Sequence, residues 1–248
     1  MNIPEDKPEL KDLAMNRFKE FDAVKNYEYY LPKVYKNIQQ PLVLTKEKAV
    51  SQADIMQVYK FPKEDSIKER VLVDITNTLL SSSKSIGLFN TLREKEHLAY
   101  SVYSSIDSSG DAYELSCNIL TTTDNKDIGE ISYDNVQKSI NGFHRQINEL
   151  KNSKYSDSDL ESAKRMLKAK LLKKEGVPSK LSALERGMEL EQNADYYNKI
   201  YAQIDSITRE DIQKFVDKAF ANPPIYSIVA SKDTLLANKE FFESLKEG

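Results

Sequence analysis

The sequence predicts an α+β fold, a mixed or antiparallel sheet with helices packed on one face. Short segments alternate between apolar and polar residues, as strands do, whereas long segments repeat apolar residues at helical spacing. Two of the strand segments are joined by a turn signature and predict a hairpin. Strands mixed with helix pairs in this way are typical of an α+β domain.

The first 45 residues have no steady period and predict a linker or wrapping arm, so the domain itself is expected over residues 46–248. A short amphipathic stretch from Leu10 to Phe21 is followed by the aromatic segment KNYEYYLPKVYKNIQQP. The tyrosines of this segment favour packing on a surface. An ordinary surface loop is the alternative.

The domain is predicted to begin with a strand and two helices. Alternation from Ala53 to Phe61 indicates a strand that ends at Pro62. Residues 66–81 predict a helix with an apolar stripe formed by Ile67, Val71, Ile75 and Leu79. A turn rich in Ser, Lys and Gly then leads to a shorter helix from Ile86 to about Lys95.

The hairpin follows directly. Its strands are LAYSVYSSID and DAYELSCNILT, joined across Ser108-Ser109-Gly110. In the second strand Cys117 shares a face with three apolar residues, Tyr113, Leu115 and Ile119. We therefore expect Cys117 to be a core thiol rather than a reactive one.

Helices occupy the next part of the chain. The first of them carries a stripe at spacings of three and four, formed by Val136, Ile140, Phe143, Ile147 and Leu150. Ser158 and Glu161 predict a capping box for the second helix. Gly176-Val177-Pro178 ends that helix, and Pro178 can open another at its first turn.

The last segment predicts one more helix, a strand and a terminal helix. Thr208 and Asp211 resemble a helix cap. Asn222-Pro223-Pro224 breaks the chain before the strand IYSIVAS, and a final helix runs to Leu245.

Composition excludes several classes of protein. The 248 residues include 36 Lys and Arg against 39 Asp and Glu, so charge gives no case for a nucleic-acid partner. No apolar run approaches the ~18 residues of a membrane span, so no membrane partner is expected. The start, MNIPEDKPELKDL, has no apolar signal core, which favours the cytoplasm without settling the compartment. The single cysteine and two histidines 47 residues apart cannot build an internal disulfide or a histidine-rich metal site.

Three patterns have an ordinary structural interpretation. The basic run could bind a polyanion but is better explained as a solvated helix face; it comprises Lys164, Arg165, Lys168, Lys170, Lys173 and Lys174. Glu94-x-x-His97 could be half of a carboxylate–histidine metal site, but no second copy exists. His144 is expected at the surface or at its boundary with the core.

Arg93 and Tyr100 form the candidate site. Arg93 ends the short helix, and Tyr100 begins a strand seven residues later. A helix, turn and strand of this length let a guanidinium and a phenol point to the same side of a sheet edge, where they could hold a developing oxyanion or a peptide carbonyl. Alternatively, Arg93 complements the helix dipole and Tyr100 packs.

The segment LFNTLREKEHLAYSVYS resembles the Leu-Phe-x-x-(Leu/Val)-Arg-Glu-Lys-x-Gly-Leu-Ala-Tyr-Ser-Val signature of the insulinase/pitrilysin family of zinc peptidases. INELKNSKYSDSDLESAKRMLKAKL and YYNKIYAQIDSITREDIQKFVDKAFANPPIYSIVAS resemble later family segments in the same order, so the similarity covers roughly residues 50–235. The resemblance implies one half of such a peptidase, which is built from homologous halves that face each other across a chamber.

The zinc motif of the family, His-x-x-Glu-His, is absent from this sequence. The resemblance therefore implies a zinc-lacking C-terminal half that encloses a peptide substrate and is not active alone. Arg93 and Tyr100 match the pair that stabilises the scissile carbonyl in the family. No cofactor is expected in this chain; zinc, the nucleophilic water and the general base would come from the zinc-bearing half, on the same polypeptide or a separate subunit. Tyr27, Tyr29 and Tyr30 are candidates for contact with it.

Two alternatives stay open. The chain could be a catalytically silent scaffold subunit related to these peptidases, or a lone peptidase with an unrecognised metal site. One residue also departs from the family signature, because His97 stands where the family usually has Gly. If the backbone there requires a positive φ, histidine is tolerated at a cost.

Overall fold

The computed structural model describes residues 12, 16, 38–64, 66–109, 111–125, 129–172 and 196–247. A five-stranded sheet with the order β1-β7-β2-β4-β3 forms its centre. The strands are β1 Leu42–Glu47, β2 Gln52–Pro62, β3 Ser101–Ser109, β4 Ala112–Thr122 and β7 Ile225–Ala230. β1 runs parallel to β7, and the other neighbours are antiparallel, so the sheet is mixed. Two short strands, β5 Asp124–Asn125 and β6 Glu130–Ile131, pair separately.

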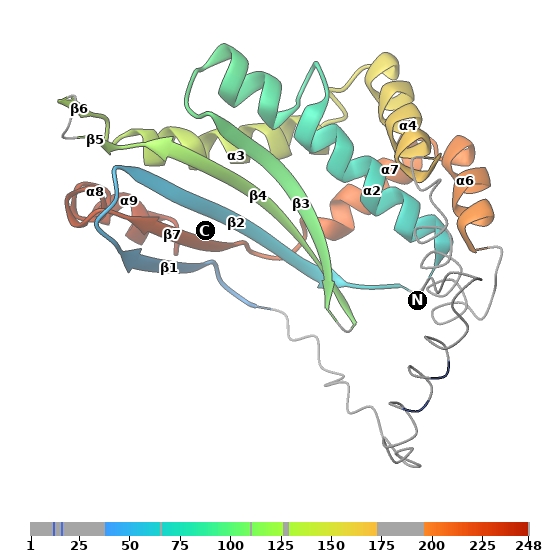
Figure 1. Cartoon of the computed structure of the whole chain (residues 1–248), viewed down its shortest axis with the longest axis horizontal. Coiled ribbons are helices and arrows are strands. Elements are labelled where there is room, and N and C mark those ends of the chain that lie inside the picture. The colour runs from blue at the N-terminus through green and yellow to red at the C-terminus, as the bar shows by residue number, and fades with distance from the viewer. Residues whose placement is uncertain are drawn as a thin grey trace.

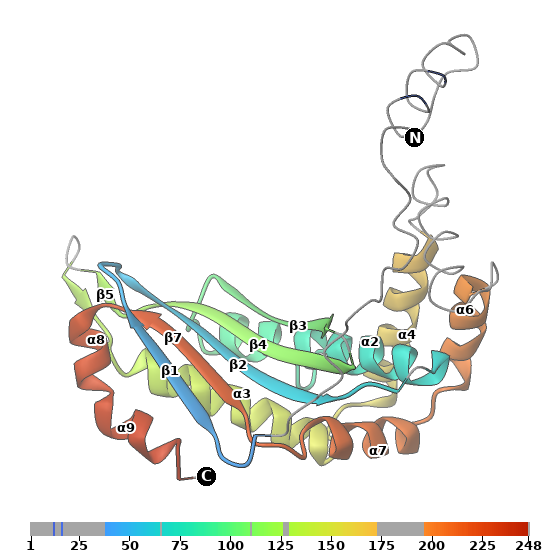
Figure 2. The ribbon, with the colours of Figure 1, turned by 90° about the horizontal axis from the view of Figure 1, so that it is seen from below.

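The helices gather on one face of this sheet, as Figures 1 and 2 show. The long helices that contact the strands are α2 Ile67–Ser82, α3 Asn135–Lys151 and α7 Arg209–Ala219. α4 Asp157–Leu172 and α6 Tyr196–Ser206 pack against α2 instead, farther from the sheet. Two short helices, α8 Lys232–Ala237 and α9 Lys239–Ser244, follow β7 at the other end of the molecule. The predicted fold class is confirmed.

Alternation of buried and exposed residues along the central strand β2 explains why the described helices pack on only one face of the sheet. Every second residue of β2 is buried, and these residues are Ala53, Ile55, Gln57, Tyr59 and Phe61. The intervening residues lie on the opposite, open face, where Met56 is exposed. Cys117 of β4 is completely buried, and its burial raises the pKa of its thiol. The core position predicted for it is confirmed.

The helix starts follow local capping chemistry, with one correction. Thr208 and Asp211 form a complete capping box at the start of α7, as predicted. α4 begins at Asp157, so the prediction of a Ser158–Glu161 box is wrong. Its cap is Ser156, whose backbone N–H and hydroxyl donate to Asp159 while Asp159 N–H donates to Ser156 Oγ at 3.1 Å. The box therefore lies two residues earlier than predicted. Asp159 also accepts hydrogen bonds from Lys84 N–H and the Ser85 hydroxyl, in the turn after α2.

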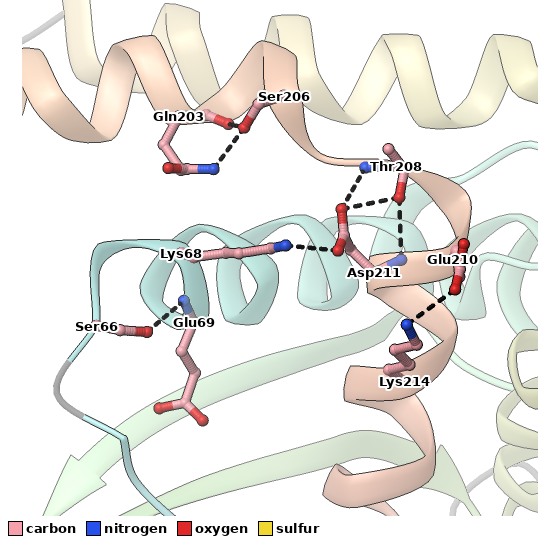
Figure 3. Close-up of polar contacts among 9 residues, drawn as sticks. All are labelled: Ser66, Lys68, Glu69, Gln203, Ser206, Thr208, Glu210, Asp211 and Lys214. Carbon is pink, nitrogen blue, oxygen red and sulfur yellow. Dashed lines mark hydrogen bonds and ion pairs between the residues drawn. The ribbon is translucent and has the colours of Figure 1, made fainter.

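An ion pair joins the starts of two helices that are far apart in the chain. Lys68 Nζ of α2 lies 2.6 Å from Asp211 Oδ1 of the α7 capping box, as Figure 3 shows. The hydrogen bond from Lys68, with those from Thr208, lowers the pKa of Asp211 to about 2, although its partial burial acts in the opposite direction. The same carboxylate therefore caps α7 and fixes it to α2.

Two features differ from the expectation. β1 was not predicted, and it crosses the expected boundary at residue 45 to form one edge of the sheet. The terminal helix is split at Asn238 into α8 and α9. The expected helix Leu10–Phe21, the tyrosines 27, 29 and 30, and the stop at residues 176–178 lie outside the described residues, apart from residues 12 and 16. Within the part described, no helix has both the length and the hydropathy to cross a membrane.

Candidate functional site

Arg93 lies on a π-helical segment, η1, that spans Phe89–Lys95. Tyr100 follows four residues after its C-cap and directly precedes β3. The structure brings the two predicted residues together, with Arg93 Cζ 4.8 Å from the centroid of the Tyr100 ring. A π-helix is rare and is often found at functional sites.

The Arg93 guanidinium lies between two aromatic rings. Phe89 covers it from within η1, with 4.7 Å between Arg93 Cζ and the ring centroid. Arg93 Nε lies 3.4 Å from Glu94 Oε1. Neither Phe89 nor Glu94 was predicted to belong to the site. The four-residue spacing of Phe89 and Arg93 was the available signal, since residues so spaced are neighbours on a helix.

Both polar groups of the pair are open to a ligand. Tyr100 is 82% exposed, and the Arg93 side chain is 34% exposed. Within the described ranges, neither the Arg93 Nη atoms nor the Tyr100 hydroxyl has a hydrogen-bond partner. The Tyr100 ring therefore does not pack into the core, and both residues keep donors for an incoming acceptor.

Helix α3 packs against η1 and its C-cap residue. Leu92 is fully buried and packs so close to Gly142 that a Cβ there would lie 2.5 Å from Leu92 Cδ2. Thr91 Oγ1 donates to Gln146 Oε1 at 3.4 Å, and Arg145 pairs with Glu96. Residues on both sides of Arg93 in the chain therefore contact α3, and these contacts hold the backbone from which the Arg93 side chain extends.

The turn after η1 has a left-handed residue. His97 has φ of 52°, the conformation for which the family signature supplies Gly. Leu98 N–H donates to Leu92 O at 2.9 Å, and Thr121 Oγ1 of β4 donates to Leu98 O at 2.6 Å. These bonds close the turn and set where the chain enters β3.

Asp159 holds the turn before η1. Its carboxylate accepts from Lys84 N–H at 2.9 Å and from the Ser85 hydroxyl, besides capping α4. Burial alone would raise the pKa of Asp159, but the hydrogen bonds from Ser85, Ser156 and Lys84 outweigh it and lower the pKa to about 2. A cleft of about 170 Å³ between α2 and α4 opens beside this carboxylate.

The other sequence candidates occupy structural positions. Lys164 is buried and donates to Asp205 O at 3.5 Å, so the solvated face expected for the basic run is wrong at this residue. Lys168 pairs with Asp205 at 2.5 Å, and both lysines thus join α4 to α6. Lys173 and Lys174 lie outside the described residues. His144 Nε2 lies 2.7 Å from the Tyr226 hydroxyl, and its burial lowers its pKa. Among the residues described, no group of three or more His, Cys, Asp or Glu side chains could hold a metal.

Comparison with known proteins identifies the family of the chain. The family model of the peptidase M16 inactive domain matches residues 2–167. No curated protein matches the sequence. Many solved structures have a similar fold.

A protease from Helicobacter pylori has a TM-score of 0.66 and 16% identity, with 92% of this chain and 53% of that one covered. A peptidase M16 inactive domain from Pseudomonas fluorescens has a TM-score of 0.64 and 16% identity, with 79% and 45% covered. Pitrilysin has a TM-score of 0.58 and 14% identity, with 80% and 20% covered. The chain thus spans about half the length of the first two structures, and it belongs to the peptidase M16 inactive-domain family, the insulinase/pitrilysin family that its sequence resembles.

Proposed function

We propose that this chain is the zinc-lacking half of an insulinase-type metallopeptidase and supplies Arg93 and Tyr100 to the scissile peptide bond. The observation that carries the proposal is the contact of the guanidinium with the Tyr100 ring, with their polar ends unpartnered among the described residues. Family membership supplies the second argument.

The proposed role is to hold one oxygen atom. When a nucleophile attacks a peptide bond, the carbonyl oxygen gains negative charge. An Arg93 Nη–H and the Tyr100 hydroxyl would donate to that oxygen, and the positive charge of Arg93 would favour the charged form over the neutral carbonyl. The zinc, the attacking water and the general base would come from the homologous zinc-bearing half.

The open face of the sheet supports the part of the proposal that concerns peptide enclosure. Leu44, Met56 and Tyr103 of β1, β2 and β3 lie in one row across this face, linked by the strand register through Ser227 and Asn118. All three are exposed apolar side chains. Such a surface suits contact with an extended peptide held in a chamber.

The test replaces Arg93 in the enzyme assembled with its zinc-bearing half, isolated together with this chain from the source cells. Arg93→Ala is expected to lower kcat about 100-fold, the usual loss for one oxyanion donor. Arg165→Ala, an exposed arginine of α4, is the matched control and should leave kcat unchanged. Equal peptide cleavage by wild type and Arg93→Ala would reject the role and favour a scaffold subunit.

A further inference from the structure

We propose that Phe89 is a positioning residue for Arg93, holding the guanidinium over its ring so that the Nη donors face the scissile carbonyl. This inference rests on the proposed function. Phe89 would not touch the reacting atoms; it would act through Arg93.

The first argument is the geometry of the ring pair. Arg93 Cζ lies 4.7 Å from the Phe89 centroid and 4.8 Å from the Tyr100 centroid, so the cation is held by two rings at almost equal distances. All guanidinium N–H donors lie in the plane of the group. Rings over the guanidinium restrict its rotation while leaving the Nη–H donors available.

The second argument is the local backbone. Glu96 N–H donates to Thr91 O at 3.0 Å, a bond across five residues that marks the π-helix. Residues four apart in a helix lie about one turn apart on the same side, and Phe89 and Arg93 have this spacing within η1. This geometry places the Phe89 ring against the Arg93 side chain.

The third argument is exposure. Phe89 is 39% exposed although its neighbours Leu88 and Leu92 are fully buried. A phenylalanine used only for core packing would lie with them. Its attractive contact with the Arg93 cation gives this partly exposed ring a function at the site.

The experiment is a double-mutant cycle in the enzyme assembled with its zinc-bearing half. Phe89→Leu is expected to lower kcat about tenfold with little change in KM, because Arg93 is still present but less often correctly oriented. Phe89→Tyr keeps an aromatic face and should retain most activity. In an Arg93→Ala background, Phe89→Leu should have no further effect. Phe241→Leu in α9, a partly buried phenylalanine of the other end, is the control and should not change kcat.

A second readout needs only this chain. The Arg93 Nε–Hε signal in a ¹H–¹⁵N spectrum should carry ring-current shifts from both rings; Phe89→Leu should change it by removing the Phe89 contribution, whereas Phe89→Tyr should leave it nearly unchanged. If Arg93→Ala leaves kcat unchanged, the proposed function fails and the positioning role fails with it. If Arg93→Ala lowers kcat but Phe89→Leu does not, only the positioning role is overturned. The same holds if Phe89→Leu lowers kcat by the same factor in the Arg93→Ala background as in wild type.

Discussion

Tyr100 combines two tasks in one side chain. Its ring lies against the Arg93 guanidinium, while its hydroxyl is unpartnered among the residues described. The ring contributes cation–π attraction, and the hydroxyl contributes a hydrogen-bond donor. A substitution that removes only the oxygen separates these two contributions.

Tyr100→Phe should therefore lower kcat by about 10- to 100-fold, since one donor to the developing oxyanion is lost while Arg93 keeps its aromatic neighbour. The free energy of unfolding should stay within about 0.5 kcal/mol of wild type, because the residue is exposed. Tyr201→Phe, at an exposed position of α6, is the matched control. Steady-state kinetics of the assembled enzyme and urea denaturation of the chain measure both quantities; equal loss of kcat in the two variants would contradict the prediction.

At the scale of the element, the position of η1 depends on Gly87, which lies shortly before it in the chain. The N–H of Gly87 donates to Ser83 O at 3.0 Å. A Cβ on Gly87 would lie 2.6 Å from Ser83 N and closer still to Ser83 O. These are backbone atoms, so no side chain can rotate away to make room.

Gly87→Ala should lower the free energy of unfolding by about 2 kcal/mol and also lower kcat, because the start of η1 must shift. Gly129→Ala is an informative comparison. Gly129 has φ of 69°, and a Cβ placed there would have no atom within 4 Å, so its substitution strains only a remote turn and should leave kcat unchanged. Thermal or urea unfolding together with kinetics decides; a Gly87→Ala enzyme of normal stability and kcat would show that the close contact is tolerated.

Asp159 makes the same region sensitive to acid. Its pKa in the folded chain is about 2, below the ordinary value of 3.8, so the ionised form stabilises the fold. That stabilisation is complete above about pH 4 and is lost as the pH falls towards about 2.

Asp159→Asn should lower the free energy of unfolding at pH 7 by about 2 kcal/mol and make it less dependent on pH between about 4 and 2 than in wild type. Urea denaturation at a series of pH values measures this difference. Asp107→Asn, at an exposed position of β3, should retain the wild-type pH dependence. Parallel pH profiles for wild type and Asp159→Asn would contradict the assignment.

The sequence predicted most elements because their signals are local. The stripe of α3 and the alternation of β2 each lie within one segment, and the cap at Thr208 needs only its own turn. β1 was not predicted because its partner β7 lies about 180 residues later in the chain and because most of its own residues are exposed. Similarly, Arg93 and Tyr100 could be found from their spacing, whereas the tie from Asp159 to Ser85 joins residues 74 positions apart and has no local signature.

At the scale of the whole molecule, the described helices lie on one face of the sheet, and none of them covers the other (Figure 2). The chain also spans only about half the length of its first structural neighbours. Both observations are compatible with the proposed enzyme of two halves.

We therefore expect no peptide cleavage by this chain alone and cleavage when the zinc-bearing half is added. A zinc chelator should abolish the activity of the mixture, and added zinc should restore it, because the metal is expected in the other half. A fluorogenic peptide assay measures all three conditions. Chelator-sensitive cleavage by the chain alone would instead revive the lone-peptidase alternative.

The strand order has a consequence for synthesis. β7 lies between β1 and β2, so β1 has no neighbour until residues 225–230 have been made. During translation, β1 and one edge of the 11-residue β2 therefore remain unpaired until β7 has been made. Unpaired edges invite pairing with other nascent chains. Protection of these two strands by a chaperone would therefore matter most while the ribosome is still translating the residues between β2 and β7.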